Sequence, residues 1–291
     1  MASVKNPLEN TIIDSHHHLW DLSKLAYPWM PPGDNILRQN YLPEHFVPVI
    51  KRKNIAMTVI VQAQQTMEEI GVLLKWAEAA DFIAGVVAWA DLTSPDLGRV
   101  LDDFSRTPKI VGIRHQVHDE PDEAWLLREE VVRGLDELAR RNLTYDLLVR
   151  PQHLKYIPIL SEKVPGLKMV VDHIAKPIIA EGTIEPWATD IAAVAKIPDI
   201  YCKISGMVTE AGTNTWTVAK IQPYVKHIID LFGYNRIMFG SDWPVCLLAA
   251  SYDEVLASTL VAAGEMSDEQ RARLMARSWA CAYLRIMESD S

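Results

Sequence analysis

The chain has 291 residues, 49% of them hydrophobic, and a formal net charge of −9; this acidic balance argues against a nucleic-acid partner, because binding to a phosphate backbone needs a basic face. No apolar run reaches the roughly 18 residues that a transmembrane helix needs, and the N-terminal segment lacks the apolar stretch of a secretory signal, so we expect no membrane partner. Cys202, Cys246 and Cys281 form no CxxC pair, which favours reduced thiols and a cytoplasmic location.

The first predicted strand runs from Ile12 into three consecutive histidines, His16, His17 and His18. Because side chains alternate along an extended strand, His16 and His18 share one face and His17 points away. Two imidazoles on one face can chelate one divalent metal, such as zinc. An expression tag and a solvated polar turn are the alternative interpretations, although a tag lies outside a folded pattern.

A loop-like stretch rich in proline follows at residues 21–43. Long loops inside compact domains are often functional. Two interpretations stay open for the aromatic residues Trp20, Tyr27 and Trp29 around this loop. They wall a substrate pocket, or they cap the end of the fold as part of its core.

The rest of the chain alternates between short apolar, β-branched runs and helical patterns, as in a parallel sheet buried on both faces. We predict further strands at residues 55–61, 83–89, 110–113, 143–149, 168–171, 200–204 and 236–240. We predict helices at residues 43–53, 68–80, 97–104, 125–141, 154–163, 186–195, 218–232 and 252–263, and a final helix that begins at a capping box at Ser267 and runs through Arg285.

This pattern predicts an α/β fold, a single-domain (β/α)₈ TIM barrel over residues 1–291, because eight strands are each followed by a helix or a loop. A doubly wound open sheet is the competing architecture. It would more often show a glycine-rich phosphate turn after the first strand, and this chain shows none there.

In such a barrel the active site lies at the C-terminal ends of the strands. Buried charge is costly there unless it is paired or functional. The polar residues that we place at these ends are His16, His18, Arg114, His115, Asp146, His173, Lys203 and Asp242. Each alone is weak evidence, since a histidine can be structural and a cation can pair with an acid. We interpret Asp172 as structural, because its neighbour His173 would point the other way.

A hydrolytic metal site is the chemistry that these residue types favour. We expect His16, His18 and Asp242 to bind one divalent metal, which would acidify a water and polarise a carbonyl. Asp242 is also the candidate that accepts a proton from the attacking water.

Other polar and aromatic residues would hold the substrate. We expect three of them to stabilise an oxyanion or to grip an anionic or polyhydroxylated substrate: Arg114, His173 and Lys203. The predicted substrate contacts are Trp20, Trp29 and Trp243, which could stack on a sugar-like ring, and His115.

Six segments together resemble amidohydrolase family 2, in the branch of L-fuconolactonase-like sugar lactonases. They are residues 14–20 (DSHHHLW) with 27–29 (YPW), 112–115 (GIRH), 171–177 (VDHIAKP), 202–206 (CKISG) and 238–246 (MFGSDWPVC). The similarity spans nearly the whole chain in the right order, and the last segment is the most specific.

The resemblance implies hydrolysis of a sugar-acid lactone, an aldonolactone of the L-fuconolactone kind, to its hydroxy acid. By the family pattern, His16, His18 and Asp242 match metal ligands, and His173 matches the strand-six histidine. Residues 143–149 lack the strand-five histidine of many relatives. Some similar lactonases work without metal, so we expect one divalent metal, zinc, that is weakly bound or dispensable.

Two other functions stay open at this point. One is another reaction of the same family, either hydrolysis of an aromatic-derived lactone dicarboxylate or metal-dependent decarboxylation. A dicarboxylate site should show several arginines, and the strand ends offer Arg114, with Arg150 as a further candidate. The other is a non-catalytic metabolite-binding barrel. A homo-oligomer is compatible with the sequence.

Overall fold

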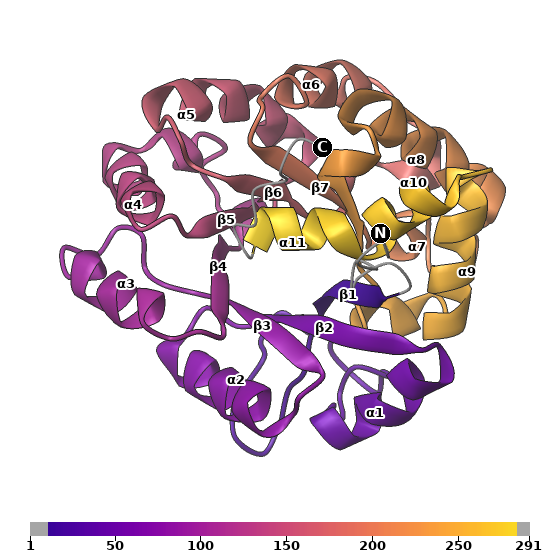
Figure 1. Ribbon diagram of the computed structural model, residues 1–291, viewed down its shortest axis with the longest axis horizontal. Coiled ribbons are helices and arrows are strands. Elements are labelled where there is room, and N and C mark those ends of the chain that lie inside the picture. The colour runs from indigo at the N-terminus through magenta and orange to yellow at the C-terminus, as the bar shows by residue number, and fades with distance from the viewer. Residues whose placement is uncertain (1–10, 284–291) are drawn as a thin grey trace, which may run out of the picture.

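The computed structural model describes residues 11–283, and Figure 1 shows a ring of strands surrounded by helices. All eight strands are parallel and neighbour one another in chain order, from β1 to β8. Their bounds are β1 Ile12–His17, β2 Ile55–Val61, β3 Ile83–Ala88, β4 Ile110–His115, β5 Thr144–Leu147, β6 Met169–Val171, β7 Ile200–Ile204 and β8 Ile237–Phe239. The predicted (β/α)₈ barrel is therefore confirmed, and its strand order differs from that of a doubly wound sheet.

The seam between β8 and β1 is closed by individual hydrogen bonds. The backbone N–H of Asp242 donates to the carbonyl of His16 at 2.8 Å, and that of His18 donates to the carbonyl of Trp243 at 2.6 Å. The Ser15 hydroxyl donates to the Phe239 carbonyl at 2.5 Å. The histidine run and the segment around Asp242 are thus bonded directly, although more than 200 residues separate them.

Most of the helices form an outer layer around the ring, whereas α11 lies across the centre of the ring (Figure 1). Their bounds are α1 Pro43–Arg52, α2 Met67–Ala79, α3 Leu97–Ser105, α4 Glu129–Arg140, α5 Ile157–Lys163, α6 Trp187–Val194, α7 Met207–Glu210, α8 Val218–Phe232, α9 Tyr252–Ala263, α10 Asp268–Ala272 and α11 Ser278–Tyr283. The predicted helix at 125–141 is broken at Arg128, whose extended backbone separates a 3₁₀ turn from α4. Among the described residues, no helix is long and apolar enough to cross a membrane.

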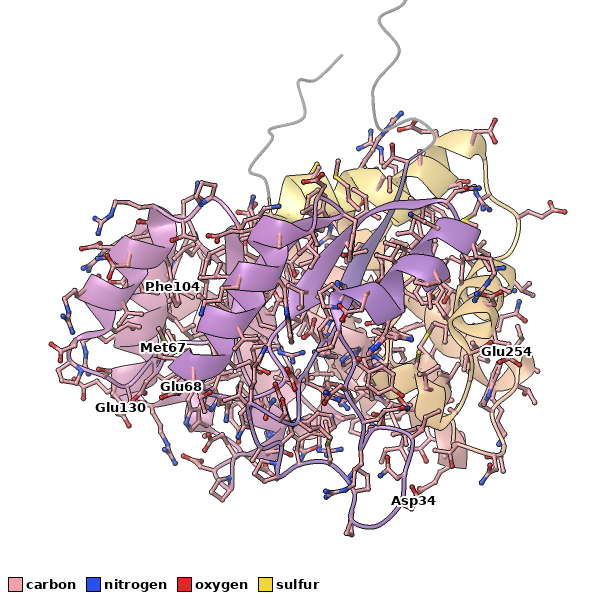
Figure 2. The ribbon with its side chains drawn as sticks, turned by 90° about the horizontal axis from the view of Figure 1, so that it is seen from below. Asp34, Met67, Glu68, Phe104, Glu130 and Glu254 are labelled. Carbon is pink, nitrogen blue, oxygen red and sulfur yellow. The ribbon has the colours of Figure 1, made fainter. Side chains whose placement is uncertain are left out.

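The capping box at Ser267 is present, but the final helix is not continuous. A π-helical turn at Arg273–Arg277 divides it into α10 and α11. Its predicted end at Arg285 lies outside the described residues. In Figure 2 these C-terminal helices and the loop that carries Asp34 lie at opposite ends of the barrel.

Apolar side chains inside the ring form their own core, which α11 completes. The members are Ile13, Val59, Val61, Val87, Val111, Val170, Met238, Ala276, Trp279, Ala280, Ala282 and Tyr283. A larger cluster fills the space between the strands and the outer helices. Because α11 packs against the inner core at the N-terminal end of the strands, the C-terminal end remains open for a site.

Candidate active site

The two histidines of β1 and the acid after β8 meet at the C-terminal end of the barrel. The Nε2 atoms of His16 and His18 are 3.2 Å apart, and Asp242 Oδ1 lies 3.3 Å from His18 Nε2 and 3.8 Å from His16 Nε2. His17 turns away and bonds Thr58 Oγ1 through Nε2 at 2.9 Å. The alternation predicted for the histidine run is therefore confirmed.

These three ligand atoms fit a divalent metal. A tetrahedral zinc with bonds of about 2.0–2.1 Å places its ligand atoms about 3.3–3.4 Å apart, close to the observed spacing. The Nδ1–H of His18 donates to the Val61 carbonyl at 2.8 Å, which leaves the Nε2 lone pair facing the cluster. His16 Nδ1 lies 3.3 Å from Asp172 Oδ1, so a carboxylate orients the second imidazole, as around many metal sites.

Asp242 is buried and held in a left-handed backbone conformation with φ of 58°. Burial opposes its ionisation, but His173, His18 and His16 around it outweigh burial and hold the pKa of Asp242 below its usual range. The carboxylate is therefore ionised, as a metal ligand or a base must be.

His173 reaches the same place from a tight turn after β6. His173, Ile174, Ala175 and Lys176 all have φ between 48° and 62°, and the Trp187 indole N–H donates to the Ile174 carbonyl at 2.7 Å. In this turn the alternation of an extended strand does not apply. Asp172 and His173 therefore both contact His16, with Asp172 Oδ1 3.3 Å from His16 Nδ1 and the centroids of the two imidazole rings 4.5 Å apart. The prediction that Asp172 and His173 point in opposite directions is wrong.

The turn presents His173 with its Nε2 toward Asp242. Ser205 Oγ lies 2.8 Å from His173 Nδ1, and His173 Nε2 lies 3.9 Å from Asp242 Oδ1. Burial lowers the pKa of His173 to about 4, so the imidazole is neutral. Gly206 leaves room for it: a Cβ there would lie 2.7 Å from His173 Nδ1.

A buried network of charges lies beneath these residues. Asp172 contacts Arg114 Nη1 and Lys203 Nζ, each at 3.0 Å, and Lys203 Nζ contacts Asp146 Oδ2 at 2.5 Å. The Tyr283 hydroxyl donates to both Asp146 oxygens, at 2.8 and 2.7 Å. Burial opposes the ionisation of Asp172, but the neighbouring Lys203 and His16 outweigh burial and hold the pKa of Asp172 well below its usual range.

Lys203 belongs to this network and not to the surface of the site. Its side chain is fully buried and its ammonium also lies 3.3 Å from His16 Nδ1. The prediction that Lys203 grips substrate is therefore corrected: it neutralises two carboxylates and supports a histidine.

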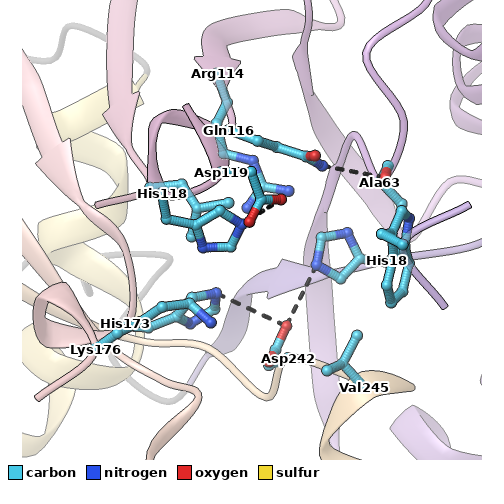
Figure 3. Close-up of a pocket in the computed structure, with 12 residues that line it drawn as sticks. His18, Ala63, Arg114, Gln116, His118, Asp119, His173, Lys176, Asp242 and Val245 are labelled. Atoms are coloured by element: carbon cyan, nitrogen blue, oxygen red, sulfur yellow. Dashed lines mark hydrogen bonds and ion pairs between the residues drawn. The ribbon is translucent and has the colours of Figure 1, made fainter. Parts of the chain in front are cut away.

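A cavity of about 260 Å³ opens above the cluster, and Figure 3 shows its walls. It is lined by His18, Trp29, Ala63, Arg114, Gln116, His118, Asp119, Leu148, His173, Lys176, Asp242 and Val245. The predicted site residues His18, Trp29, Arg114, His173 and Asp242 are thus brought together at one surface, while His16 lies directly beneath it.

Three predicted substrate contacts do not line this cavity. Trp20 is fully buried and donates from Nε1 to the carbonyl of Gln39 at 2.8 Å. Trp243 stacks on Phe46 with ring centroids 4.4 Å apart. His115 stacks on Trp125 at 4.1 Å and bonds Glu120 through Nε2 at 2.7 Å. All three are core residues, which corrects the predicted stacking and binding roles.

The cavity also contains polar residues that sequence reasoning missed: Gln116, His118, Asp119 and Lys176. Lys176 stands within the family-like segment 171–177, so that motif already contained a signal for it. Gln116, His118 and Asp119 lie just after β4. Their position directly beyond the end of a strand was a second signal that they could reach the site.

We expect Gly240→Ala to loosen the site, because a Cβ at this position would lie 2.6 Å from the Cβ of His16. The crowding should cost about 1–3 kcal/mol of the free energy of unfolding, and the affinity for a divalent metal, probed with zinc, should fall as His16 is displaced. Urea denaturation and calorimetric zinc titration measure the two effects. Gly71→Ala is the matched control, because the described residues leave its Cβ position open. Unchanged zinc affinity in Gly240→Ala would contradict the assignment of His16.

Comparison with known proteins agrees with this geometry. The amidohydrolase family model matches residues 13–277, and the chain therefore belongs to the amidohydrolase family. L-fucono-1,5-lactonases of Burkholderia ambifaria and Burkholderia multivorans are 34% and 36% identical to it, over 83% and 84% of this chain and 83% and 85% of their own lengths.

A solved structure shares the fold closely. The crystal structure of an amidohydrolase from Burkholderia multivorans with bound zinc has a TM-score of 0.89 and 34% sequence identity, and the match covers 94% of this chain and 99% of that chain. Together with the ligand spacing, this likeness supports a divalent-metal site at His16, His18 and Asp242.

Proposed function

We propose that the protein is a lactonase that hydrolyses a sugar-acid lactone, with L-fucono-1,5-lactone as the reference substrate, to the open-chain hydroxy acid. The observation that carries this proposal is the convergence of His18, Asp242 and His173 on a cavity of about 260 Å³, which suits a monosaccharide-sized ligand. The two L-fucono-1,5-lactonase relatives support the substrate class.

The charges in the cavity wall favour a neutral substrate. Arg114 is paired with Asp172 at 3.0 Å, and Lys176 is paired with Glu210 at 3.0 Å. Because each of these cations is already paired with a carboxylate, neither offers an uncompensated charge to a dicarboxylate, although each can still donate hydrogen bonds to a neutral substrate or to a charge that develops on it. Arg150, the further candidate for a dicarboxylate site, is exposed and donates to the backbone carbonyl of His118 at 3.4 Å. These contacts favour a neutral lactone over the dicarboxylate alternative.

The reaction follows from the position of Asp242. Its carboxylate accepts a proton from a water as the water oxygen bonds to the lactone carbonyl carbon. The bond between this carbon and the ring oxygen then breaks, and the proton held by Asp242 passes to the departing alkoxide. One water is consumed, and the product is a hydroxy acid.

His173 is placed to stabilise the negative charge that develops on the carbonyl oxygen. Ser205 Oγ occupies Nδ1, and in the tautomer that we assign the Ser205 hydroxyl donates to Nδ1 while Nε2 carries the hydrogen and faces the cavity beside Asp242. A neutral donor fixed in advance acts without reorganisation during the reaction. We assign Arg114, which lines the same cavity, to the same developing charge.

We infer that the metal is zinc and that it binds only moderately. His16, His18 and Asp242 would hold it, and when bound it would acidify the water and polarise the carbonyl. Arg114 Nη1 and Lys203 Nζ each lie 3.3 Å from a nitrogen of His16, so two resident cations repel the incoming ion. This repulsion supports a metal that is weakly bound or dispensable.

We further infer a cytoplasmic enzyme that works as a single domain. Among the described residues, Cys202, Cys246 and Cys281 form no disulfide bond, which agrees with reduced thiols. Residues 11–283 contribute to one ring and its covering helices.

A panel of stereoisomeric aldonolactones, followed with a pH indicator, tests the function. We expect L-fucono-1,5-lactone or a close stereoisomer to release acid at a rate far above spontaneous opening, and added zinc to raise that rate. Metal analysis of the purified protein gives the zinc content. Failure to release acid from every member, with and without zinc or manganese, would refute the lactonase proposal.

A further inference from the structure

Three residues that line the cavity each have a buried polar atom with no hydrogen-bond partner among the described residues. These atoms are Nε1 of Trp29, Nε of Arg114 and Nδ1 of His118. Arg114 already bonds Asp172 and the Gln62 carbonyl through its Nη atoms. Leaving a buried donor or acceptor unpaired costs about 1–3 kcal/mol. When such atoms line a binding cavity, the ligand is the natural source of their missing partners.

His118 lies across the cavity from the reacting groups. It belongs to a 3₁₀ turn at Val117–Asp119 directly after β4, whereas Asp242 follows β8. In a ring of eight strands, β4 and β8 are four strands apart in either direction and therefore face each other. Figure 3 shows His118 and Asp119 together on one wall, apart from Asp242.

The hydrogen-bonding state of His118 follows from its surroundings. Its Nε2 lies 3.2 Å from Asp119 Oδ2, and a carboxylate at this distance favours the tautomer in which Nε2 carries the hydrogen. Burial, with the nearby charges of Lys176 and Arg150, lowers the pKa of His118 to about 2, so the imidazole is neutral. Nδ1 therefore carries a lone pair and can only accept a hydrogen bond.

We propose that His118 is a specificity-determining residue whose Nδ1 accepts a hydrogen bond from a ring hydroxyl of the lactone, while the lactone carbonyl lies at Asp242. This inference rests on the proposed function and adds the orientation of the substrate to it. The carbonyl and ring oxygens of a lactone are acceptors only, so a hydroxyl is the group that satisfies Nδ1.

Trp29 supplies the complementary donor. Its indole N–H needs an acceptor oxygen, and its ring packs edge-on against the buried Trp20 with centroids 5.7 Å apart, which fixes its position. A hydroxyl both donates and accepts, so a polyhydroxylated ring satisfies His118 and Trp29 together. An apolar or aromatic ring without hydroxyls would leave both atoms unpaired.

The test pairs variants of His118 with lactones that lack one hydroxyl at a time. His118→Phe and His118→Gln both remove the acceptor at Nδ1, the second with an amide that reaches only toward Nε2. His118→Asn keeps an amide oxygen near Nδ1 and should restore most of the interaction. We expect the first two to raise KM for L-fucono-1,5-lactone about tenfold with little change in kcat. His45→Phe, an exposed histidine on α1, is the matched control.

The decisive result is whether the effect of a His118 variant on KM depends on which hydroxyl the lactone carries. For one singly deoxygenated lactone, His118→Phe and His118→Gln should leave KM unchanged, because the hydroxyl that Nδ1 would bind is already gone. An equal effect on the parent and every deoxygenated lactone would overturn the proposal. Wild-type turnover of the parent lactone tests the proposed function separately, so a turning-over enzyme without coupling would refute the hydroxyl contact alone. Zinc content and the urea midpoint should match wild type.

Discussion

Replacing Asp242 by asparagine should lower kcat for lactone hydrolysis about 10³-fold, because the amide cannot accept the proton of the attacking water. Asparagine is well suited to this position, since it tolerates the left-handed backbone that Asp242 adopts, with φ of 58°. The barrel should therefore fold, and the loss should be one of chemistry. Zinc content should also fall, because one ligand loses its charge.

Steady-state kinetics with L-fucono-1,5-lactone, zinc analysis and urea denaturation separate these effects. Asp253→Asn is the matched control, because Asp253 forms only a surface ion pair with Arg52 and Lys53. It should leave kcat unchanged. A kcat for Asp242→Asn within about tenfold of wild type would remove Asp242 from the role of base.

Lys203→Met should destabilise the barrel by about 3–5 kcal/mol, because it leaves two buried carboxylates without their shared cation. Asp146 and Asp172 both contact the ammonium, and none of the three side chains reaches solvent. The free energy of unfolding, measured with urea, reports the loss. Zinc affinity should change as well, because Asp172 orients His16.

The double variant Asp146→Asn/Lys203→Met controls for this effect. It removes one negative charge together with the positive charge, so it should recover part of the stability that Lys203→Met loses. A Lys203→Met protein as stable as wild type would contradict the reading of this network as a charge-balanced unit. Tyr283→Phe is a milder probe, since it removes only the hydroxyl that donates to Asp146.

This network joins the C-terminal end of the described chain to the candidate metal ligands. Tyr283 of α11 bonds Asp146 at the N-terminal side of the barrel, Asp146 contacts Lys203, and Lys203 contacts His16 at the C-terminal side. The helix that plugs the barrel therefore also sets charge and position beneath the site. Truncation of that helix would affect both stability and the geometry of His16.

The sequence alone predicted the eight-strand barrel, which the structure confirms, and the three candidate metal ligands, which the structure brings together. Short β-branched runs and their alternation with helical patterns are local properties, and so is the i, i+2 spacing that places His16 and His18 on one face. The C-terminal ends of the strands of a barrel lie at the same end of the ring, and this rule predicted that Asp242 lies close to His16 and His18. The left-handed turn at His173 was beyond such rules, since four consecutive residues with positive φ are not a local preference of their side chains.

Tertiary structure alone decided which polar and aromatic residues reach the cavity. Lys203 lies within β7, so it points into the floor, whereas His173 and Asp242 lie beyond their strand ends and reach the opening. Trp20 and Trp29 look alike in sequence, but only Trp29 lines the cavity. The contact between Tyr283 and Asp146 joins residues 137 positions apart. Such outcomes depend on depth along the barrel axis and on packing between distant segments, and neither is encoded in the spacing of nearby residues.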